Sequence, residues 1–371
     1  MLFRSSAALG RGAKSRVVTR LRARHVDAVR PEGVEDGSIL SVFRVPRESE
    51  GMRLDVFMVS QFRRTSRTRA QGIIRTSAHG QDGNRLRPND RVFAEQLICL
   101  WRAPWDEVSV PTIVPVLYED EWLMVVDKPS GLPVHPTARY YRNTLIKVME
   151  EERPGQFITL VHRIDRETSG TLIIAKDPET DRMMKKQLEE RADVEKGYRA
   201  ITWGVPGEGA FANTIGLARS ADDLRACRYE QSVELDPTHS TGVRMRLGVS
   251  DQALHAATRF RVLDIRARGD RRYAEMQCDL ETGRQHQIRI HLMALGAPIV
   301  GDKLYGPDER LFARGADGEL TEEDHALLEL PRHALHAARL AFNHPRTGVR
   351  LVVEAPMPIE LAEFWDELER V

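Results

Sequence analysis

The sequence lacks the patterns that mark several classes of protein. Its three cysteines, Cys99, Cys227 and Cys278, are far apart and form no CxxC pair. A zinc site, an iron–sulfur cluster or a disulfide framework is therefore not expected, and a reducing compartment is favoured. No run of about eighteen apolar residues occurs, which argues against a membrane-spanning helix. The absence of GxGxxG and GxxxxGK(S/T) stretches argues against a bound nucleotide cofactor.

Charge is balanced overall but unevenly distributed. Residues 1–102 hold 20 Lys and Arg against 10 Asp and Glu, and the remainder holds 35 against 45. The first part is thus +10 and the second −10, which indicates a basic front end that meets a polyanion. An arginine-rich genome bias is the alternative explanation for this excess of basic residues.

The first 26 residues contain seven basic side chains and no acidic one. This composition fits a mitochondrial transit peptide, an RNA-contacting tail or an upstream extension of the reading frame. We predict a flexible basic tail over residues 1–38 and a cytoplasmic protein, with mitochondrial targeting as the alternative.

The rest of the chain is predicted to form a compact unit over residues 39–103, a linker over 104–112 and a longer domain over 113–371. Apolar periodicity in the longer domain predicts helices over 144–152 and 181–191, and strands over 123–126, 172–175, 198–203, 256–263, 273–280 and 334–342. Residues 218–253 and 307–329 lack a sustained period and are predicted to be surface excursions. Strands and helices in no regular alternation indicate an α+β fold.

Residues 53–91 contain nine arginines against three acidic residues. Within them, RTSRTRAQGIIR predicts a helix that is capped by Thr65 or Ser66, with apolar residues on one face and Arg67, Arg69 and Arg75 on the other. Phosphate oxygens are the natural partners of these guanidinium groups, because the arginine fork matches their geometry. A solvated basic helix without a partner is the alternative.

The features around this helix resemble the ribosomal S-four-like RNA-binding domain. In RLDVFMVSQFRRTSRTRAQGIIRTSAHGQDGNRLRPNDRV, an apolar helix, an arginine-rich helix and an NG…D-type hairpin follow one another. The polar GQDGNRLRPND replaces the usual compact strand before the turn. The resemblance implies a small α/β module that binds RNA through Arg67, Arg69 and Arg75.

The segment LVHRIDRETSGTLIIAKD, residues 160–177, places many ionisable groups beside a buried strand, with a predicted turn at Thr168, Ser169 and Gly170. Charges are costly to bury unless they are paired, and a carboxylate between arginines stays ionised with a lowered pKa. Asp165 is therefore a candidate nucleophile, general base or metal ligand. The side chains of His162 and Asp165 are expected to diverge on an extended chain, and His286 and His291 are five apart, off a common helical face, so we expect no metal.

Two further stretches offer phosphate and base recognition. TGRQHQIRIHL is predicted to be a helix from Thr282 and Gly283 onward that presents Arg284 and Arg289. Tyr198, in VEKGYRAITWG, offers an aromatic face that can stack on a nucleobase without sequence-specific contacts. Taken singly these features are ordinary, since strand tyrosines are mostly core residues and helix arginines are mostly solvated.

Taken together, the motifs resemble the RluA family of pseudouridine synthases. The stretches that follow the order and rough spacing of that family are EDEWLMVVDKPSGLPVHP, HRIDRETSGTLIIAKD, VEKGYRA, TGRQHQIRIHLMALGAPIVGDKLYG and HALHAARLAFNHP. The resemblance spans roughly residues 113–358. It implies the pseudouridine synthase fold, with a mixed, mostly antiparallel sheet flanked by helices, and the isomerisation of uridine without a cofactor.

The resemblance also implies roles for individual residues. Asp165 stands at the position of the catalytic aspartate, and Arg289 at that of the basic residue that pairs with it. Tyr198 matches the tyrosine that packs on the target uracil, and Arg163 matches an arginine that fills the space left by a flipped-out base. His162 is expected to border the substrate and to fix its loop by hydrogen bonding.

The sequence therefore predicts a monomeric enzyme that isomerises uridine in structured RNA, with ribosomal RNA favoured by the front module and transfer RNA possible. A non-catalytic RNA-binding or ribosome-assembly factor on the same scaffold is the alternative. A glycoside hydrolase would need a second carboxylate at a suitable separation, for which Glu167 is the only near candidate. The residues leave open whether Asp165 attacks C1′, adds to the uracil ring or assists an elimination.

Overall fold

The chain divides into two compact units, Met1–Asp106 and Glu107–Val371, and the division falls within the predicted linker 104–112. Each unit has its own sheet. The computed structural model describes residues 20–21, 26–62, 65–137, 140–191, 193–206, 210–213, 216–219, 229–232, 255–308 and 310–371.

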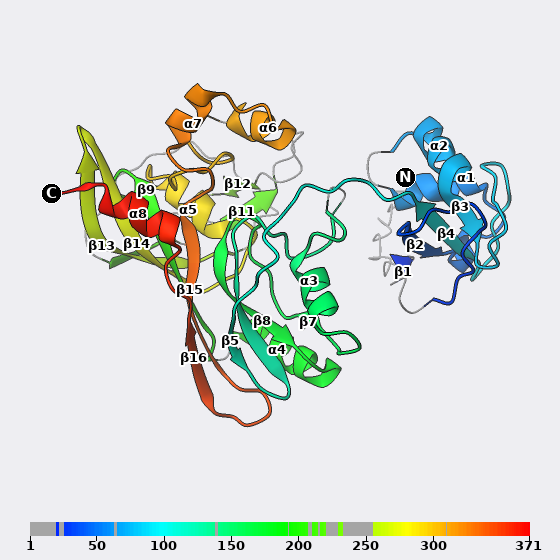
Figure 1. Ribbon diagram of the computed structural model, residues 1–371, viewed down its shortest axis with the longest axis horizontal. Coiled ribbons are helices and arrows are strands. Elements are labelled where there is room, and N and C mark those ends of the chain that lie inside the picture. The colour runs from blue at the N-terminus through cyan, green and yellow to red at the C-terminus, as the bar shows by residue number, and fades with distance from the viewer. Residues whose placement is uncertain are drawn as a thin grey trace, which may run out of the picture. The chain divides into compact units, whose positions relative to one another are not determined.

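The first unit packs two helices against an antiparallel sheet with the strand order β1-β2-β4-β3 (Figure 1). Its elements are β1 (Arg20–Leu21), β2 (Ile39–Arg44), η2 (Arg47–Ser49), α1 (Leu54–Gln61), α2 (Arg67–Ser77), β3 (Ala78–Gly80) and β4 (Leu97–Arg102). Phe57 of α1 and Ala70 and Ile74 of α2 are buried in one core with strand residues. The Oγ of Ser66 accepts a hydrogen bond from the amide of Arg69 at 3.2 Å, so the predicted cap of the arginine-rich helix is confirmed.

The second unit is built on a sheet of 11 strands in the described part of the chain, with the order β10-β13-β14-β9-β15-β8-β6-β5 along its main path. Strands β16, β17 and β7 pair with β15, β13 and β8, respectively. The bounds of the main-path strands are β5 (Val116–Glu119), β6 (Leu123–Lys128), β8 (Ser169–Ala175), β9 (Glu195–Trp203), β10 (Ala210–Asn213), β13 (Thr258–Arg268), β14 (Arg271–Leu280) and β15 (Leu335–Asn343). The others are β7 (Thr159–Leu160), β16 (Arg350–Glu354), β17 (Glu369–Arg370) and a separate pair, β11 (Gly216–Arg219) and β12 (Tyr229–Ser232).

Helices flank this sheet (Figure 1). They are α3 (Leu145–Glu152), α4 (Pro178–Glu190), α5 (Gln287–Ala294), α6 (Arg310–Asp317), α7 (Glu322–Leu328) and α8 (Ile359–Asp366). Strands β8 and β15 pair in parallel, and the other pairs described in the sheet are antiparallel. The α+β class and the mixed, mostly antiparallel sheet are therefore confirmed.

Three details of the sequence prediction were wrong. Ser169 and Gly170 belong to β8 and not to the preceding turn. The helix predicted from Thr282 begins only at Gln287, so Arg284 lies in the loop before it. Residues 307–329 contain α6 and α7, and α7 starts with a capping box between Thr321 and Asp324. Of the predicted excursion 218–253, the structure describes only residues 218–219 and 229–232, which belong to β11 and β12.

None of the helices in the described ranges is long and apolar enough to cross a membrane.

Gly170 marks the point where β15 approaches β8 most closely. Its φ is 111°, and a Cβ there would collide with the backbone of Ala337. We expect Gly170→Ala to lower the free energy of unfolding of the second unit by more than about 2 kcal/mol, because strain and collision add. Urea unfolding measures the loss. Gly155→Ala is the control, since Gly155 also has a positive φ, 80°, but open space around it, and should lose only about 1 kcal/mol. Equal losses in the two variants would contradict the collision.

Candidate active site

A cavity of about 240 Å³ lies on the face of β9 that carries Tyr198, bordered by α5 and by the loop before β8. It brings together six of the predicted site residues: His162, Arg163, Asp165, Tyr198, Arg284 and Arg289. The cavity is smaller than the roughly 300–1,000 Å³ of sites for drug-sized ligands, which suits one nucleobase with its sugar at the mouth.

Arg289, on α5, joins two carboxylates. Its Nε and Nη2 donate to the two oxygens of Asp302 at 2.6 and 2.8 Å, and its Nη1 donates to Oδ2 of Asp165 at 3.0 Å. The side chain of Asp302 is 0% exposed, whereas that of Asp165 is 17% exposed and borders the cavity. Asp302 therefore fixes the direction of the guanidinium, and the remaining nitrogen is presented to Asp165.

The charges around Asp165 favour its ionised form. Burial acts to raise the pKa of Asp165, but His286, Arg289 and His333, with the hydrogen bond from Arg289, hold it below its ordinary value. Burial lowers the pKa of His286 to about 4 and that of His333 to about 3. At neutral pH these two imidazoles are uncharged, so Arg289 is the permanent cation that keeps Asp165 ionised.

His286 and Tyr305 complete the surroundings of this pair. The Nε2 of His286 lies 3.7 Å from Oδ1 of Asp165, and its Nδ1 lies 3.0 Å from the hydroxyl of Tyr305. The guanidinium of Arg289 lies 5.2 Å from the centre of the Tyr305 ring, a cation–π contact. His286 has a left-handed backbone with φ 57°, a strained conformation for a residue with a Cβ, and it lies directly at the candidate active site.

Buried polar groups hold the loop that carries Asp165. Lys128 donates from Nζ to the carbonyl of Arg166 at 3.0 Å, and Ser130 donates to the carbonyl of Glu167 at 2.8 Å. The Nε2 of His162 accepts a hydrogen bond from the amide of Ile173 in β8 at 3.1 Å. His162 thus ties the loop to the sheet, in agreement with its predicted hydrogen-bonding role.

Tyr198 offers a flat surface and not a proton acceptor. Burial, with a smaller contribution from Asp165, raises the pKa of its hydroxyl well above the ordinary value, so the phenol stays neutral. Arg163 is exposed, and within the described ranges its guanidinium makes no hydrogen bond or ion pair, which leaves it available to RNA. Arg284 donates from Nε to the carbonyl of His255 at 3.1 Å, so one side of its guanidinium is engaged by the protein.

Glu167, the carboxylate that a glycosidase would need, does not line the cavity. Both of its oxygens accept hydrogen bonds from Lys303 at 3.2 Å. It is a half-buried member of an ion pair, and the geometry gives no support to a two-carboxylate hydrolase.

In the first unit, the three predicted phosphate contacts differ from one another. Arg67 donates to the fully buried Asp55 at 3.0 Å, together with Arg53. Arg69 and Arg75 are exposed, and among the residues that the structure describes their guanidinium groups have no partner. Arg67 is thus partly committed to the fold of the unit, whereas Arg69 and Arg75 are free to meet a ligand.

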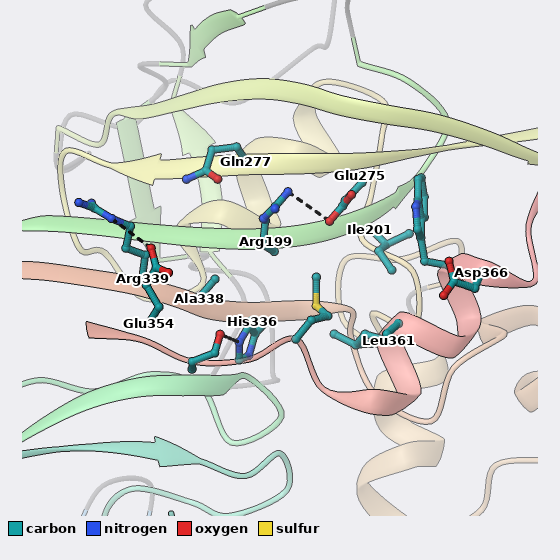
Figure 2. Close-up of a pocket in the computed structure, with 14 residues that line it drawn as sticks. Arg199, Ile201, Glu275, Gln277, His336, Ala338, Arg339, Glu354, Leu361 and Asp366 are labelled. Carbon is teal, nitrogen blue, oxygen red and sulfur yellow. Dashed lines mark hydrogen bonds and ion pairs between the residues drawn. The ribbon is translucent and has the colours of Figure 1, made fainter. Parts of the chain in front are cut away.

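A larger cavity, of about 390 Å³, lies on the opposite face of β9, because Arg199 alternates with Tyr198 along the strand. Figure 2 shows its wall, with α8 along one side. The charged groups there are engaged in ion pairs: Arg199 lies 3.2 Å from Glu275, Arg339 lies 3.7 Å from Glu354, and Asp366 lies 3.1 Å from Arg266. Among the residues that the structure describes, this face therefore offers no unpaired charge for chemistry, in contrast to the face of Tyr198.

Comparison with known proteins agrees with the geometry. Residues 122–294 match the family described as RNA pseudouridylate synthase. The chain is 33% identical to ribosomal large subunit pseudouridine synthase D of Pseudomonas aeruginosa, over 85% of this chain and 91% of that protein. It is 32% identical to the protein of the same name from Xanthomonas campestris pv. campestris, over 87% of this chain and 91% of the other. Among solved structures, human RNA pseudouridylate synthase domain containing 4 aligns with a TM-score of 0.52 and 26% identity, covering 69% of this chain and 94% of that chain.

The chain belongs to the RNA pseudouridylate synthase family, and the RluA-family resemblance of its motifs is confirmed. It is an RNA pseudouridine synthase, an enzyme that isomerises uridine in RNA.

Sequence reasoning missed Asp302 and His286 as parts of the site. Asp302 had a local signal, because its Oδ1 also accepts from the amides of Leu304 and Tyr305 at 2.9 and 3.0 Å, and Asp is typical of such side-chain-capped turns. Arg289 was predicted to pair with one carboxylate, and its guanidinium has further N–H donors that need a second acceptor when it is buried. His286 had no signal beyond its position beside Arg289.

Removal of the positive charge at position 289 should move the acid limb of the activity profile to higher pH. Asp165 would lose the cation that lowers its pKa, so activity that needs the carboxylate would disappear about 1–3 pH units earlier on acidification. The variant to measure is Arg289→Met combined with Asp302→Asn, because Asp302 alone would become an unpaired buried charge. The dependence of kcat/KM on pH gives the answer. Arg289→Lys keeps a charge between the carboxylates and should keep the limb near its wild-type position, and an unmoved limb in the double variant would refute the role of Arg289.

Proposed function

We propose that the chain converts uridine to pseudouridine in large-subunit ribosomal RNA, with Asp165 as the reacting carboxylate. The observation that carries the proposal is an ionised carboxylate, held by Arg289, at the wall of a cavity that also contains Tyr198. The relatives named as ribosomal large subunit pseudouridine synthases support the choice of RNA.

The reaction breaks the N1–C1′ bond of uridine, turns the detached uracil and joins it again through C5, with the C5 proton lost and N1 protonated. Atoms are conserved, so the protein has to supply position and charge. Asp165 would act at the sugar or at the ring. Tyr198 would support the uracil with its flat face during the turn, and Arg163 would occupy the gap that the everted nucleotide leaves in the RNA.

Asp165→Asn should remove pseudouridine formation while the fold and RNA binding persist. The asparagine keeps the size of the side chain, and Arg289 stays paired with Asp302, so no buried charge is orphaned. We expect turnover to fall by at least about a thousandfold, with RNA affinity within about twofold of wild type. Pseudouridine mapping in ribosomal RNA from cells without the gene, complemented by either form, provides the measurement. A site that is restored by the Asn variant would rule out Asp165 as the reacting group.

We propose further that the first unit holds the RNA through phosphate contacts from Arg69 and Arg75. These two arginines are exposed on α2, and guanidinium groups without protein partners match phosphate oxygens. Arg67 would contribute less, because its guanidinium is shared with Asp55.

The double variant Arg69→Gln/Arg75→Gln should weaken RNA binding and make it less sensitive to salt. Loss of two phosphate contacts lowers the slope of log K against log salt by about 1.4 to 1.8. Filter binding at several salt concentrations measures the slope. Arg44→Gln is the matched control, because Arg44 is an arginine of the same unit that lies 3.7 Å from Glu95. The proposal fails if the double variant and the control have the same slope as wild type.

A further inference from the structure

Lys196 lines the same cavity as Asp165 and has no acceptor among the described residues. It lies on β9 two residues before Tyr198. The other six lysines in the described part of the chain each meet an oxygen: Lys128, Lys147, Lys176, Lys185, Lys186 and Lys303. Lys196 makes no such contact with any described residue. Burial lowers the pKa of Lys196 to about 8, so its ammonium stays largely protonated at neutral pH.

Lys196 forms no ion pair with any described neighbour. A Cβ at Gly283 would lie 3.8 Å from Nζ of Lys196, which places the ammonium beside the backbone of the loop before α5. The other cations of the wall, Arg163 and Arg284, carry the same sign, and the carboxylate of Asp165 is bound by Arg289. What the wall lacks is an anion next to Lys196.

A bound RNA would supply such an anion. A base turned into the cavity brings the phosphates of its own nucleotide to the mouth. Residues two apart on a strand are separated by about 7 Å, so a base on Tyr198 leaves Lys196 within reach of the adjacent phosphodiester. Uracil itself is neutral, and contact with a base carbonyl would leave the ammonium without a counter-charge.

We infer that Lys196 binds a non-bridging phosphate oxygen of the phosphodiester next to the everted uridine and so positions the sugar against Asp165. The inference rests on the proposed function for the everted uridine. Lys196 is then a positioning residue, distinct from the groups that touch the reacting bond.

Binding to poly(U) at several salt concentrations tests the inference without knowledge of the target site. Lys196→Met, which keeps the stem but not the charge, should weaken binding about tenfold and lower the salt slope by about 0.7. Lys196→Arg keeps a cation and should restore both quantities. Lys186→Met is the control, since Lys186 is 67% exposed and pairs with Glu190, and it should behave as wild type. Thermal unfolding of each variant checks that the fold is kept.

Turnover on a ribosomal RNA transcript separates the possible outcomes. A higher KM with little change in kcat for Lys196→Met, together with the lower slope, supports the phosphate contact. An unchanged slope refutes it, whether or not kcat falls, because a group that acts on uracil or on the fold leaves the charge contacts with RNA intact. If the wild-type enzyme leaves ribosomal RNA unmodified but Lys196→Met still lowers the salt slope, the proposed RNA substrate is refuted and the phosphate contact of Lys196 stands.

Discussion

The guanidinium of Arg289 is the group on which the site depends. It donates two hydrogen bonds to the buried Asp302 and one to Asp165 at the cavity. Arginine can do this because its N–H donors lie in one rigid plane, whereas an ammonium is a point charge without fixed direction. A buried ion pair is stable only when the geometry is good and the remaining lone pairs are satisfied. The backbone amides of Leu304 and Tyr305, which donate to Asp302, meet that requirement.

The sheet brings this contact together from distant parts of the chain. Asp165 and Arg289 are 124 residues apart. Asp165 precedes β8 and Arg289 follows β14, and the strand order places β9 and β15 between those two strands. The cavity therefore lies over the middle of the sheet, where Tyr198 of β9 and Leu335 of β15 line its wall. Since β9 alternates its side chains, the same strand carries Arg199 toward α8 on the other face.

The sequence predicted the parts of the fold and site that follow from local pattern or from family motifs. Strand and helix positions in the second unit came from periodicity, and the contact between Asp165 and Arg289 came from the order of the motifs. Asp302 and His286 were missed because their roles depend on tertiary contacts and not on spacing. Gly170 was predicted to lie in a turn, but glycine is required there because β15 approaches β8 closely. Its partner in β15, Ala337, lies 167 residues later in the chain. Arg284 was placed on a helix because the apolar spacing of Ile288, Leu292 and Leu295 was extended back to Thr282, although the helix begins only at Gln287.

On the proposed function, the arrangement of charges also explains how a small cavity can hold a base that prefers to stay stacked in RNA. Eversion costs a few kcal/mol, and stacking on one aromatic side chain returns about 1–3 kcal/mol. Contacts inside the cavity therefore leave little surplus for affinity. On the proposals above, the surplus comes from phosphates outside it, which Arg69 and Arg75 on the first unit and Lys196 on β9 would contact. Phosphate contacts carry no base sequence, so the choice of uridine has to depend on the shape of the RNA and on how readily one nucleotide leaves its stack.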